Sequence, residues 1–309
     1  MPVPKPKVIA IVGPTASGKT SLGIYLAKKV SGEVVSADSR QVYKGLDIGT
    51  GKVTTQEMVG VPHHLLDVAS PTHIYSARDF HTDATRAIAH IRENNHVPII
   101  VGGTGFYVDT LVGRMLFPDV PPNNKLRARL DKKTPEVLYS MLEQLDPARA
   151  KTIERHNKRR LVRALEIAAA LGASPVGGPA LEAVGPYEVQ WLGVSVSDEQ
   201  LHHNIRTRLL ERIVSGMVDE ACNLHASGVS YKRMEELGLE YRFLSYLLPG
   251  TLSKEEFVTQ LETAIRQYAK RQLRWFKRNK DIHWLSHPPR SRAGKAEALR
   301  ITQQFLSTH

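Results

Sequence analysis

The sequence predicts an α/β fold in which helices flank a parallel sheet and a helical insertion interrupts the core. Three observations indicate this fold: apolar strands alternate with helical segments, a glycine-rich turn directly follows the first strand, and a proline-rich break precedes a basic, helical stretch. The chain has 309 residues, of which 41% are hydrophobic, so it can fill a sizeable core. This excludes a disordered chain and suggests two domains, or one domain with an insertion.

The first 110 residues supply the strand and helix alternation. Residues 8–12 are a continuous apolar run, typical of a strand buried on both faces of a parallel sheet. We expect a helix from residue 19 to about 30, a helix over 79–94, and further strands over 33–37 and 97–101. Right-handed crossovers between such strands would place a functional site at their carboxyl ends.

Pro118, Pro121 and Pro122 mark a boundary after this segment. We therefore divide the chain into a first part of the core, residues 1–116, a helical insertion, residues 117–186, and a completion of the core, residues 187–309. The insertion is very basic up to about residue 172 and ends in a loose Gly/Pro/Ala segment over 172–185. The last part is expected to contain a strand over 189–196, helices over about 198–227 and 254–280, a short strand over 282–285, and a helix from about 292.

Charge and cysteine content narrow the class of partner and compartment. The chain has 42 Lys and Arg against 31 Asp and Glu, a net charge of +11, which favours a polyanionic partner such as nucleic acid. The one cysteine, Cys222, excludes a disulfide framework and a Cys-based zinc site, and it favours a reducing, cytoplasmic location. No signal peptide or membrane-spanning run is visible, so we expect no membrane partner.

A phosphate-binding motif stands between the first strand and the first helix. Residues 13–20 match G-x-x-x-x-G-K-[ST], the P-loop pattern, which indicates a P-loop NTPase-like sheet. In such a loop, backbone N–H groups and the helix dipole bind a di- or triphosphate, Lys19 adds a charge, and the Thr20 hydroxyl can bind Mg²⁺. The members of the expected nucleotide or diphosphate site are Gly13, Pro14, Thr15, Ala16, Ser17, Gly18, Lys19 and Thr20.

Two polar residues follow the next strands at the same expected edge. Asp38 comes after the second strand and is either a general base toward a bound acceptor or an N-cap of the next turn. Thr104 follows the third strand and is either a hydroxyl directed at the site or a helix N-cap. That strand ends in Gly102-Gly103 rather than in the metal-binding Asp of many phosphoryl-transferring P-loop proteins, which argues against a kinase or ATPase.

The ordered motifs together resemble those of the bacterial tRNA dimethylallyltransferases. The resemblance covers about residues 8–285. Its motifs are the phosphate loop, Asp-Ser-Arg-Gln-Val-Tyr-Lys-Gly-Leu-Asp-Ile-Gly-Thr-Gly-Lys from residue 38, Pro-His-His-Leu-Leu-Asp from residue 62, Tyr-Ser-Ala from residue 75, Val-Gly-Gly-Thr-Gly-Phe-Tyr from residue 101, Arg-Leu-Val-Arg-Ala-Leu-Glu from residue 160, and Lys-Arg-Gln-Leu-Arg-Trp-Phe from residue 270. The family resembled transfers a dimethylallyl group from dimethylallyl diphosphate to N6 of the adenosine 3′ of the anticodon, position 37, in tRNAs that read codons beginning with U.

The resemblance implies roles for individual residues. Lys19 and the phosphate loop would stabilise the departing diphosphate with Mg²⁺, Asp38 would be the general base, and Thr104 would lie near the reacting nucleotide. Arg208 would bind the diphosphate. The resemblance, together with the basic composition of two segments, predicts contacts with the tRNA anticodon stem-loop at Asp38, Ser39, Arg40, Gln41, Thr104, Arg127, Arg159, Arg160, Leu161, Val162, Arg163, Lys270, Arg271 and Arg274. We expect the enzyme to be a monomer.

The chain departs from the family pattern at two places, and alternatives remain. The family usually has an arginine where Asn204 stands, and its Gly-Tyr-Lys/Arg-Glu motif is altered over Gly238–Phe243. Two basic stretches, residues 149–163 and 266–280, favour RNA over a free nucleotide as the prenyl acceptor. A P-loop kinase and a non-catalytic RNA-binding protein are the alternatives from other classes. Tyr268 and Trp275 are expected to pack in a core rather than to stack on a base.

Overall fold

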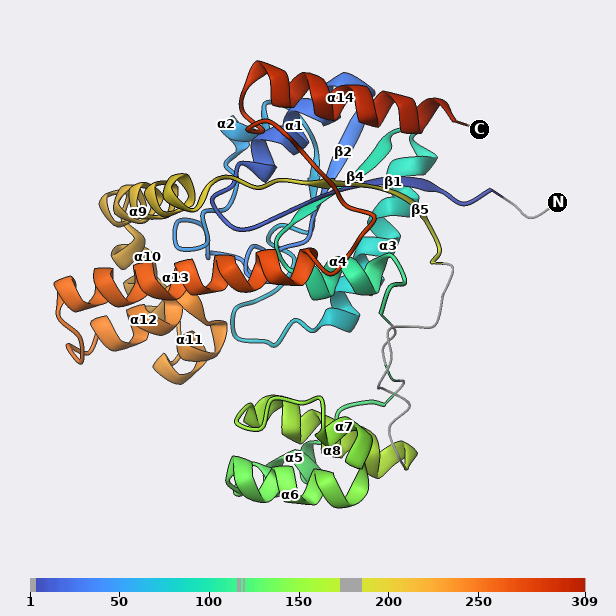
Figure 1. The fold of residues 1–309 in the computed structure, drawn as a ribbon. Coiled ribbons are helices and arrows are strands. Elements are labelled where there is room, and N and C mark those ends of the chain that lie inside the picture. The colour runs from blue at the N-terminus through green and yellow to red at the C-terminus, as the bar shows by residue number, and fades with distance from the viewer. Residues whose placement is uncertain (1–3, 116–117, 119, 173–184, 309) are drawn as a thin grey trace. The chain divides into compact units, whose positions relative to one another are not determined.

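The structure, a computed structural model, describes residues 4–115, 118, 120–172 and 185–308. A sheet of six parallel strands forms its centre, in the order β3-β2-β4-β1-β5-β6 (Figure 1). The strands are β1 (Lys7–Val12), β2 (Gly32–Ser36), β3 (His63–His64), β4 (Val97–Gly102), β5 (Glu188–Gly193) and β6 (His283–Trp284). The predicted parallel α/β sheet is confirmed. The short edge strand β3 was not predicted, because two histidines carry no strand pattern.

The central strand β1 shows why this sheet needs helices on both faces. Its residues Val8 to Val12 are fully buried, as a strand in the middle of a parallel sheet requires. Val8, Ala10 and Val12 belong to one apolar core, and Ile9 and Ile11 belong to the core on the opposite face. The continuous apolar run in the sequence therefore follows from burial on two sides.

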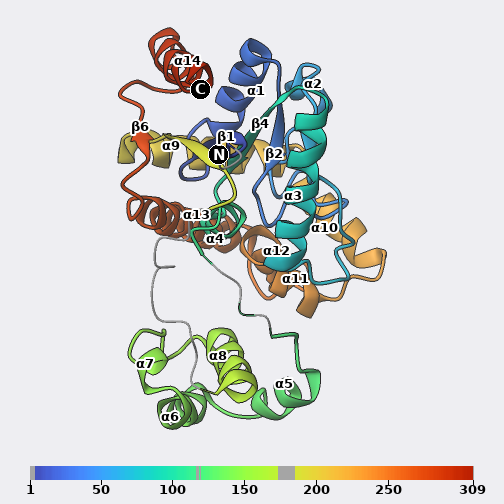
Figure 2. The same ribbon diagram turned by 90° about the vertical axis from the view of Figure 1, so that its right-hand side faces the viewer.

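The helices that cover these two faces come from distant parts of the chain. On one face lie α1 (Lys19–Val30) and the last helix, α14 (Arg292–Ser307). On the other face lie α3 (Ala77–Glu93), α4 (Gly105–Leu111) and the end of α13 (Lys254–Phe276), as Figures 1 and 2 show. Capping boxes start α3 at Ser76 and α13 at Ser253, because each serine side chain accepts from the backbone three residues later.

A third core is formed by helices beyond the sheet. It contains apolar residues of α9 (Asp198–Val214), α10 (Met217–Ala226), α11 (Tyr231–Leu237), α12 (Leu239–Leu247) and α13. The sequence predicts one helix over 198–227, but the structure breaks it at Gly216, whose φ of 98° lies in the left-handed region. Helix α13 ends at Phe276 rather than near 280. The short helix α2 (Thr55–Met58) lies between β2 and β3.

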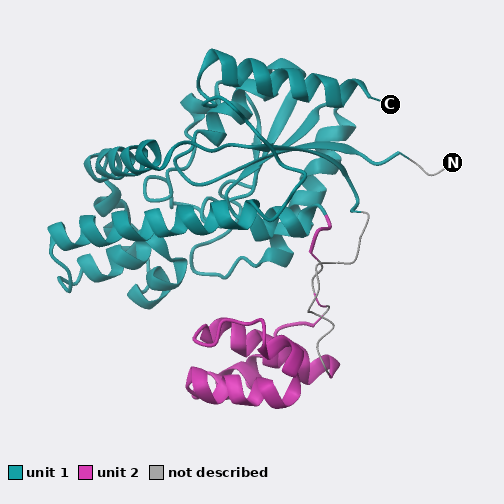
Figure 3. Cartoon of the chain, in the orientation of Figure 1, with its two compact units in different colours: residues 1–112, 185–309 teal, residues 113–184 magenta. Residues whose placement is uncertain are grey.

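The chain separates into two compact units (Figure 3). Unit 1 is Met1–Val112 with Gly185–His309, and unit 2 is Gly113–Val184. Unit 2 has its own apolar core and the helices α5 (Asn124–Leu130), α6 (Pro135–Leu145), α7 (Pro147–Ala150) and α8 (Lys158–Leu171). The expected insertion, residues 117–186, nearly coincides with unit 2. Of the loose segment expected over 172–185, residues 173–184 lie outside the described residues.

Candidate active site at the carboxyl ends of the strands

The phosphate loop joins β1 to α1, and its glycines stand where the fold leaves no room for a side chain. A Cβ at Gly13 would come within 2.2 Å of the Val194 carbonyl oxygen, and Gly18 has a φ of 94°. Within the loop, the buried Ser17 hydroxyl donates to the Pro14 carbonyl at 2.8 Å. The predicted order of strand, loop and helix is present.

A cavity of about 1090 Å³ opens over this loop. The residues that line it come from the phosphate loop, the turn at Asp38, the end of β4, helices α9 and α13, and a loop before α14. All of them belong to unit 1. A cavity at the carboxyl ends of parallel strands is the position at which α/β sheets bind ligands.

Lys19 brings a tunable positive charge to this cavity. Its ammonium group donates to the Pro14 carbonyl within its own loop. The pKa of Lys19 is lowered to about 7, mainly by burial. The nearby Asp38 acts in the opposite direction, and the positive charge of Arg208 acts with burial. A bound polyanion would replace the lost solvation and favour the protonated lysine.

Arg208 and Asn204 face the same cavity from α9. Burial lowers the pKa of Arg208, and the positive charges of Arg212 and Arg290 lower it further. Asn204, where an arginine was expected from the resemblance, donates through Nδ2 to the Ala16 carbonyl at 3.0 Å. This amide therefore supports the phosphate loop and adds no charge to the cavity.

Asp38 shapes its own turn and also lines the cavity. Its Oδ1 accepts from the N–H groups of Arg40 at 2.8 Å and Gln41 at 3.4 Å, which shapes the turn after β2. Asp38 also lines the cavity, as Lys19 and Arg208 do. Because only one carboxylate oxygen bonds to this turn, the other remains for an acceptor substrate.

Thr104 precedes α4 but does not cap it through its side chain. Its hydroxyl instead accepts from the Ser39 N–H at 3.1 Å, which ties the end of β4 to the turn at Asp38. At the neighbouring Gly102, a Cβ would lie 2.2 Å from the Ala37 carbonyl oxygen. The end of β4 thus has no space for the carboxylate that many phosphoryl-transferring proteins carry there.

Gln272 and Tyr268 are site residues that the sequence reading missed. The buried Gln272 accepts from the Thr15 N–H at 2.8 Å and donates to the Gly103 carbonyl at 2.9 Å, so it links the phosphate loop to the end of β4. Tyr268 lines the cavity instead of packing in a core, and burial raises its pKa to about 12, to which the charge of Asp38 also contributes. The two residues lie four positions apart in α13, but no local signal in the sequence marks either of them as a residue of the cavity.

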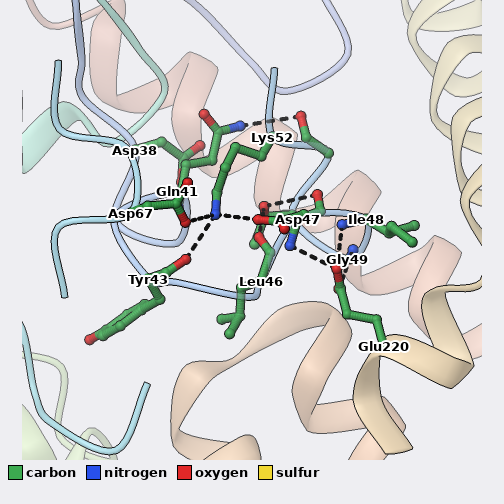
Figure 4. A network of polar contacts seen from close by, with 12 residues as sticks. Asp38, Gln41, Tyr43, Leu46, Asp47, Ile48, Gly49, Lys52, Asp67 and Glu220 are labelled. Atoms are coloured by element: carbon green, nitrogen blue, oxygen red, sulfur yellow. Dashed lines mark hydrogen bonds and ion pairs between the residues drawn. The ribbon is translucent and has the colours of Figure 1, made fainter. Parts of the chain in front are cut away.

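The glycine-rich loop over 45–52 is joined by hydrogen bonds to the turn that follows Asp38 (Figure 4). Lys52 is buried and donates to the Tyr43 carbonyl at 2.9 Å and to the carboxylates of Asp47 and Asp67, each at 2.5 Å. The amide of Gln41 donates to the Gly51 carbonyl at 3.3 Å. Glu220 of α10 accepts from the backbone N–H groups of residues 47–49.

The altered segment Gly238–Phe243 continues this network. The Tyr241 hydroxyl donates to Glu220 at 2.5 Å, and Glu240 pairs with Arg212 at 3.1 Å. Arg212 in turn donates to the Gly49 carbonyl at 2.7 Å. The segment thus holds the loop that carries Gly49.

The cavity offers a hydroxyl oxygen to a hard cation such as Mg²⁺. Thr20 lines the cavity, and its hydroxyl is the kind of ligand that Mg²⁺ prefers. In the part of the chain that the structure describes, no group of three or more His, Cys, Asp or Glu side chains could hold a metal ion. With Thr20 as a single protein ligand, a cation here would take its other ligands from water and from a bound anion.

Comparison with known proteins identifies the family. The profile described as IPP transferase matches residues 41–279. The chain is 44% identical over 282 residues to tRNA dimethylallyltransferase 2 of Shewanella sediminis, covering 90% of this chain and 92% of the relative. It is 38% identical over 304 residues to tRNA dimethylallyltransferase 1 of Geotalea uraniireducens, covering 97% and 96%. The chain belongs to the IPP transferase family.

Solved structures of this family share the fold. A eukaryotic dimethylallyltransferase acting on tRNA superposes with a TM-score of 0.82 at 28% identity, over 98% of this chain and 80% of that protein. The tRNA isopentenylpyrophosphate transferase of Staphylococcus epidermidis superposes with a TM-score of 0.72 at 35% identity, over 98% and 100%. The resemblance drawn from the motifs is confirmed at the level of the family.

Helix α13 presents the exposed cations that the sequence reading expected. Lys270, Arg271 and Arg274 are exposed, while Ile265, Ala269 and Phe276 of the same helix are buried. Arg266, also counted in this basic stretch, is paired with the buried Glu262. Fewer unpaired positive charges are therefore exposed on this helix than the sequence suggests.

Unit 2 uses part of its predicted RNA-binding set for its own packing. Arg159 and Arg160 are exposed, and Arg160 pairs with Glu154 at 3.2 Å. The side chains of Leu161 and Val162 lie in the apolar core of the unit, so the expected RNA contact cannot be made by these side chains.

Arg127 and Arg163 converge on a buried carboxylate. Arg127 donates two hydrogen bonds of 2.9 Å to Glu166, which is 1% exposed, and Arg163 pairs with the same carboxylate. These contacts hold the pKa of Glu166 at about 2, against the effect of its burial. Arg127 therefore ties α5 to α8, whereas Arg163 pairs with Glu166 within α8 and donates to the Val120 carbonyl at 2.9 Å.

Proposed function

We propose that this chain transfers the dimethylallyl group of dimethylallyl diphosphate to N6 of the adenosine 3′ of the anticodon, position 37, in tRNAs that read codons beginning with U. Membership of the IPP transferase family supports the reaction class. The observation that carries the proposal is that Lys19 and Arg208 share one cavity with Asp38. This shared cavity supports a site at which one chain binds the leaving diphosphate and supplies the general base, and we propose that a monomer is active.

In the proposed reaction, the two substrates meet different groups of the cavity. The allylic C–O bond breaks, and its electron pair leaves with the diphosphate, which the phosphate loop, Lys19 and Arg208 stabilise. The N6 lone pair forms the new C–N bond, and the N6 proton passes to the Asp38 carboxylate. Magnesium bound at Thr20 would neutralise charge on the diphosphate oxygens.

The acceptor base must leave its stack to reach the cavity. Unstacking costs a few kcal/mol, which phosphate contacts elsewhere on the RNA can offset. We assign these contacts to exposed cations of α13 and α8, which are Lys270, Arg271, Arg274, Arg159 and Arg160. As expected from the family, we add Arg127 and Arg163. The residues that would lie beside the reacting nucleotide are Ser39, Arg40, Gln41 and Thr104.

Among the described helices, none combines the length and the apolarity that crossing a membrane requires.

Incubation with labelled dimethylallyl diphosphate, Mg²⁺ and one of three acceptors tests the proposal. We expect label in an unmodified tRNA with adenosines following its anticodon, and no label when the adenosine adjacent to the anticodon is replaced by guanosine. Label in AMP but not in tRNA would instead support prenylation of a free nucleotide. ATP hydrolysis without any prenyl transfer would contradict the proposal.

A further inference from the structure

The loop between β6 and α14 carries a cation that no sequence motif pointed to. Pro288, Pro289 and Arg290 line the same cavity as the phosphate loop, although almost 270 residues separate them from it in the chain. A Cβ placed on Gly18 would meet Pro289 Cγ at 3.1 Å and the Cγ and Nε atoms of Arg290 at 3.7 Å. The loop therefore lies directly against the turn that begins α1.

This loop is held in one conformation by its own hydrogen bonds. Ser291 donates twice to the Pro288 carbonyl, from its N–H at 3.0 Å and from its hydroxyl at 2.7 Å. Glu297 accepts from the Ser286 N–H at 3.1 Å, and Pro289 is buried. Helix α14, which follows, packs on α1 across the apolar core that contains Ala298 and Leu26. The backbone that carries Arg290 is thus fixed relative to the phosphate loop.

The charges around the cavity are not balanced. Over the residues that the structure describes, neither Arg208 nor Arg290 forms a hydrogen bond or an ion pair through its guanidinium. The proximity of the Arg290 charge lowers the pKa of Arg208, so the two guanidinium groups repel each other. Two of the carboxylates that line the cavity are already bound, Glu240 to Arg212 and Glu57 to Thr54.

We propose that Arg290 is a second diphosphate-binding arginine, which holds the leaving group together with Arg208. Guanidinium groups bind phosphate oxygens with two parallel hydrogen bonds, and a polyanion between Lys19, Arg208 and Arg290 would turn their repulsion into attraction. The exposed position of Arg290 leaves it open to an incoming ligand. The inference rests on the proposed function only in naming the diphosphate as a leaving group.

Titration calorimetry of the full chain with inorganic diphosphate tests the binding step without any prenyl transfer. We expect Arg290→Gln to weaken binding about tenfold or more, as one lost charge-assisted hydrogen bond would. Arg290→Lys should retain an intermediate affinity, because a lysine keeps the charge but not the planar fork. Arg292→Gln is the matched control, since Arg292 is exposed two residues away and does not line the cavity. Its affinity should equal that of the unaltered chain.

A second measurement separates this inference from the proposed function. In the prenyl-transfer assay, Arg290→Gln should raise the KM for dimethylallyl diphosphate by a similar factor and leave tRNA binding unchanged. Equal diphosphate affinity in Arg290→Gln and the unaltered chain, with a loss in Arg208→Gln, would overturn the role of Arg290. An unaltered chain that binds diphosphate through Arg290 but never prenylates tRNA would support the binding site and refute the proposed reaction.

Discussion

At the scale of single residues, the cavity contains both a carboxylate, Asp38, and a buried ammonium group, Lys19. Asp38 keeps one carboxylate oxygen in its own turn, while Lys19 is partly stripped of water and has a depressed pKa. Asp38 therefore shapes its turn through one carboxylate oxygen and leaves the other for the proposed role of general base. A substitution that preserves the turn can therefore test the proposed role of Asp38 as general base.

Asp38→Asn isolates the proposed role of general base. The asparagine Oδ1 can still accept from Arg40 and Gln41, so the turn should persist. Without a general base, we expect prenyl transfer to tRNA to fall by about 10²-fold or more, with tRNA affinity unchanged. Single-turnover kinetics with labelled donor measure the effect. Asp38→Ala, which also removes the turn acceptor, is the comparison. Normal turnover in the asparagine variant would remove Asp38 from the role of base.

The pKa of Lys19 predicts how diphosphate binding depends on pH. The free chain has a pKa of about 7 there, and a bound polyanion raises this pKa, so binding takes up a proton above that value. Affinity relative to a Lys19→Gln variant should be constant below about pH 7 and fall up to tenfold per unit above it. Calorimetric titration with inorganic diphosphate between about pH 6 and about pH 9 measures this ratio. A ratio that does not change with pH would show that Lys19 stays charged throughout.

At the scale of elements, α13 contributes residues to the cavity and exposes other residues to solvent. Gln272 and Tyr268 reach the cavity, Phe276 packs under the sheet, and Lys270, Arg271 and Arg274 are exposed. The same helix thus carries both residues of the cavity and exposed positive charges. This arrangement suits a substrate that enters the site by one nucleotide and extends beyond it.

The exposed face of α13 should determine part of the salt dependence of tRNA binding. Arg271→Gln with Arg274→Gln removes two charges, so the slope of log affinity against log salt should decrease in magnitude by about two. Arg292→Gln with Arg300→Gln removes the same charge from exposed positions of α14 and should change the slope little. Filter binding over a series of salt concentrations measures both. Equal slopes for the two double variants would show that α13 does not contact phosphates.

At the scale of the whole molecule, the two units have separate apolar cores. The core of unit 2 contains only residues of that unit, and the three cores of unit 1 contain none of them. The cavity is likewise lined by unit 1 alone. Diphosphate binding and recognition of the larger substrate are therefore separable in principle.

Replacement of residues 113–184 by a flexible Gly/Ser linker tests this separation. Because no core of unit 1 is opened, we expect the remaining chain to fold cooperatively and to bind inorganic diphosphate with unchanged affinity. Its affinity for tRNA should fall, since Arg159 and Arg160 are removed. Thermal unfolding, calorimetry and filter binding follow these three properties. An unfolded or diphosphate-inactive product would contradict the independence of unit 1.

Much of this molecule could be predicted from sequence because the decisive signals are local. A strand buried on both faces must be apolar throughout, and a phosphate loop must carry glycines at fixed spacing next to Lys19. The family followed from the order of such motifs. The break at Gly216 and the edge strand β3 were missed because their signals are short and compete with longer patterns.

Only the tertiary structure decided which distant residues meet at the site. Gln272 and Arg290 lie more than 250 residues from the phosphate loop, and nothing in their local sequence distinguishes them from other helical or surface residues. Conversely, Leu161 and Val162 stand in a basic segment but are buried. Local patterns determined the strands, the phosphate loop and the family, because these depend on neighbouring residues. The direction in which each side chain points depended on packing between segments far apart in the chain.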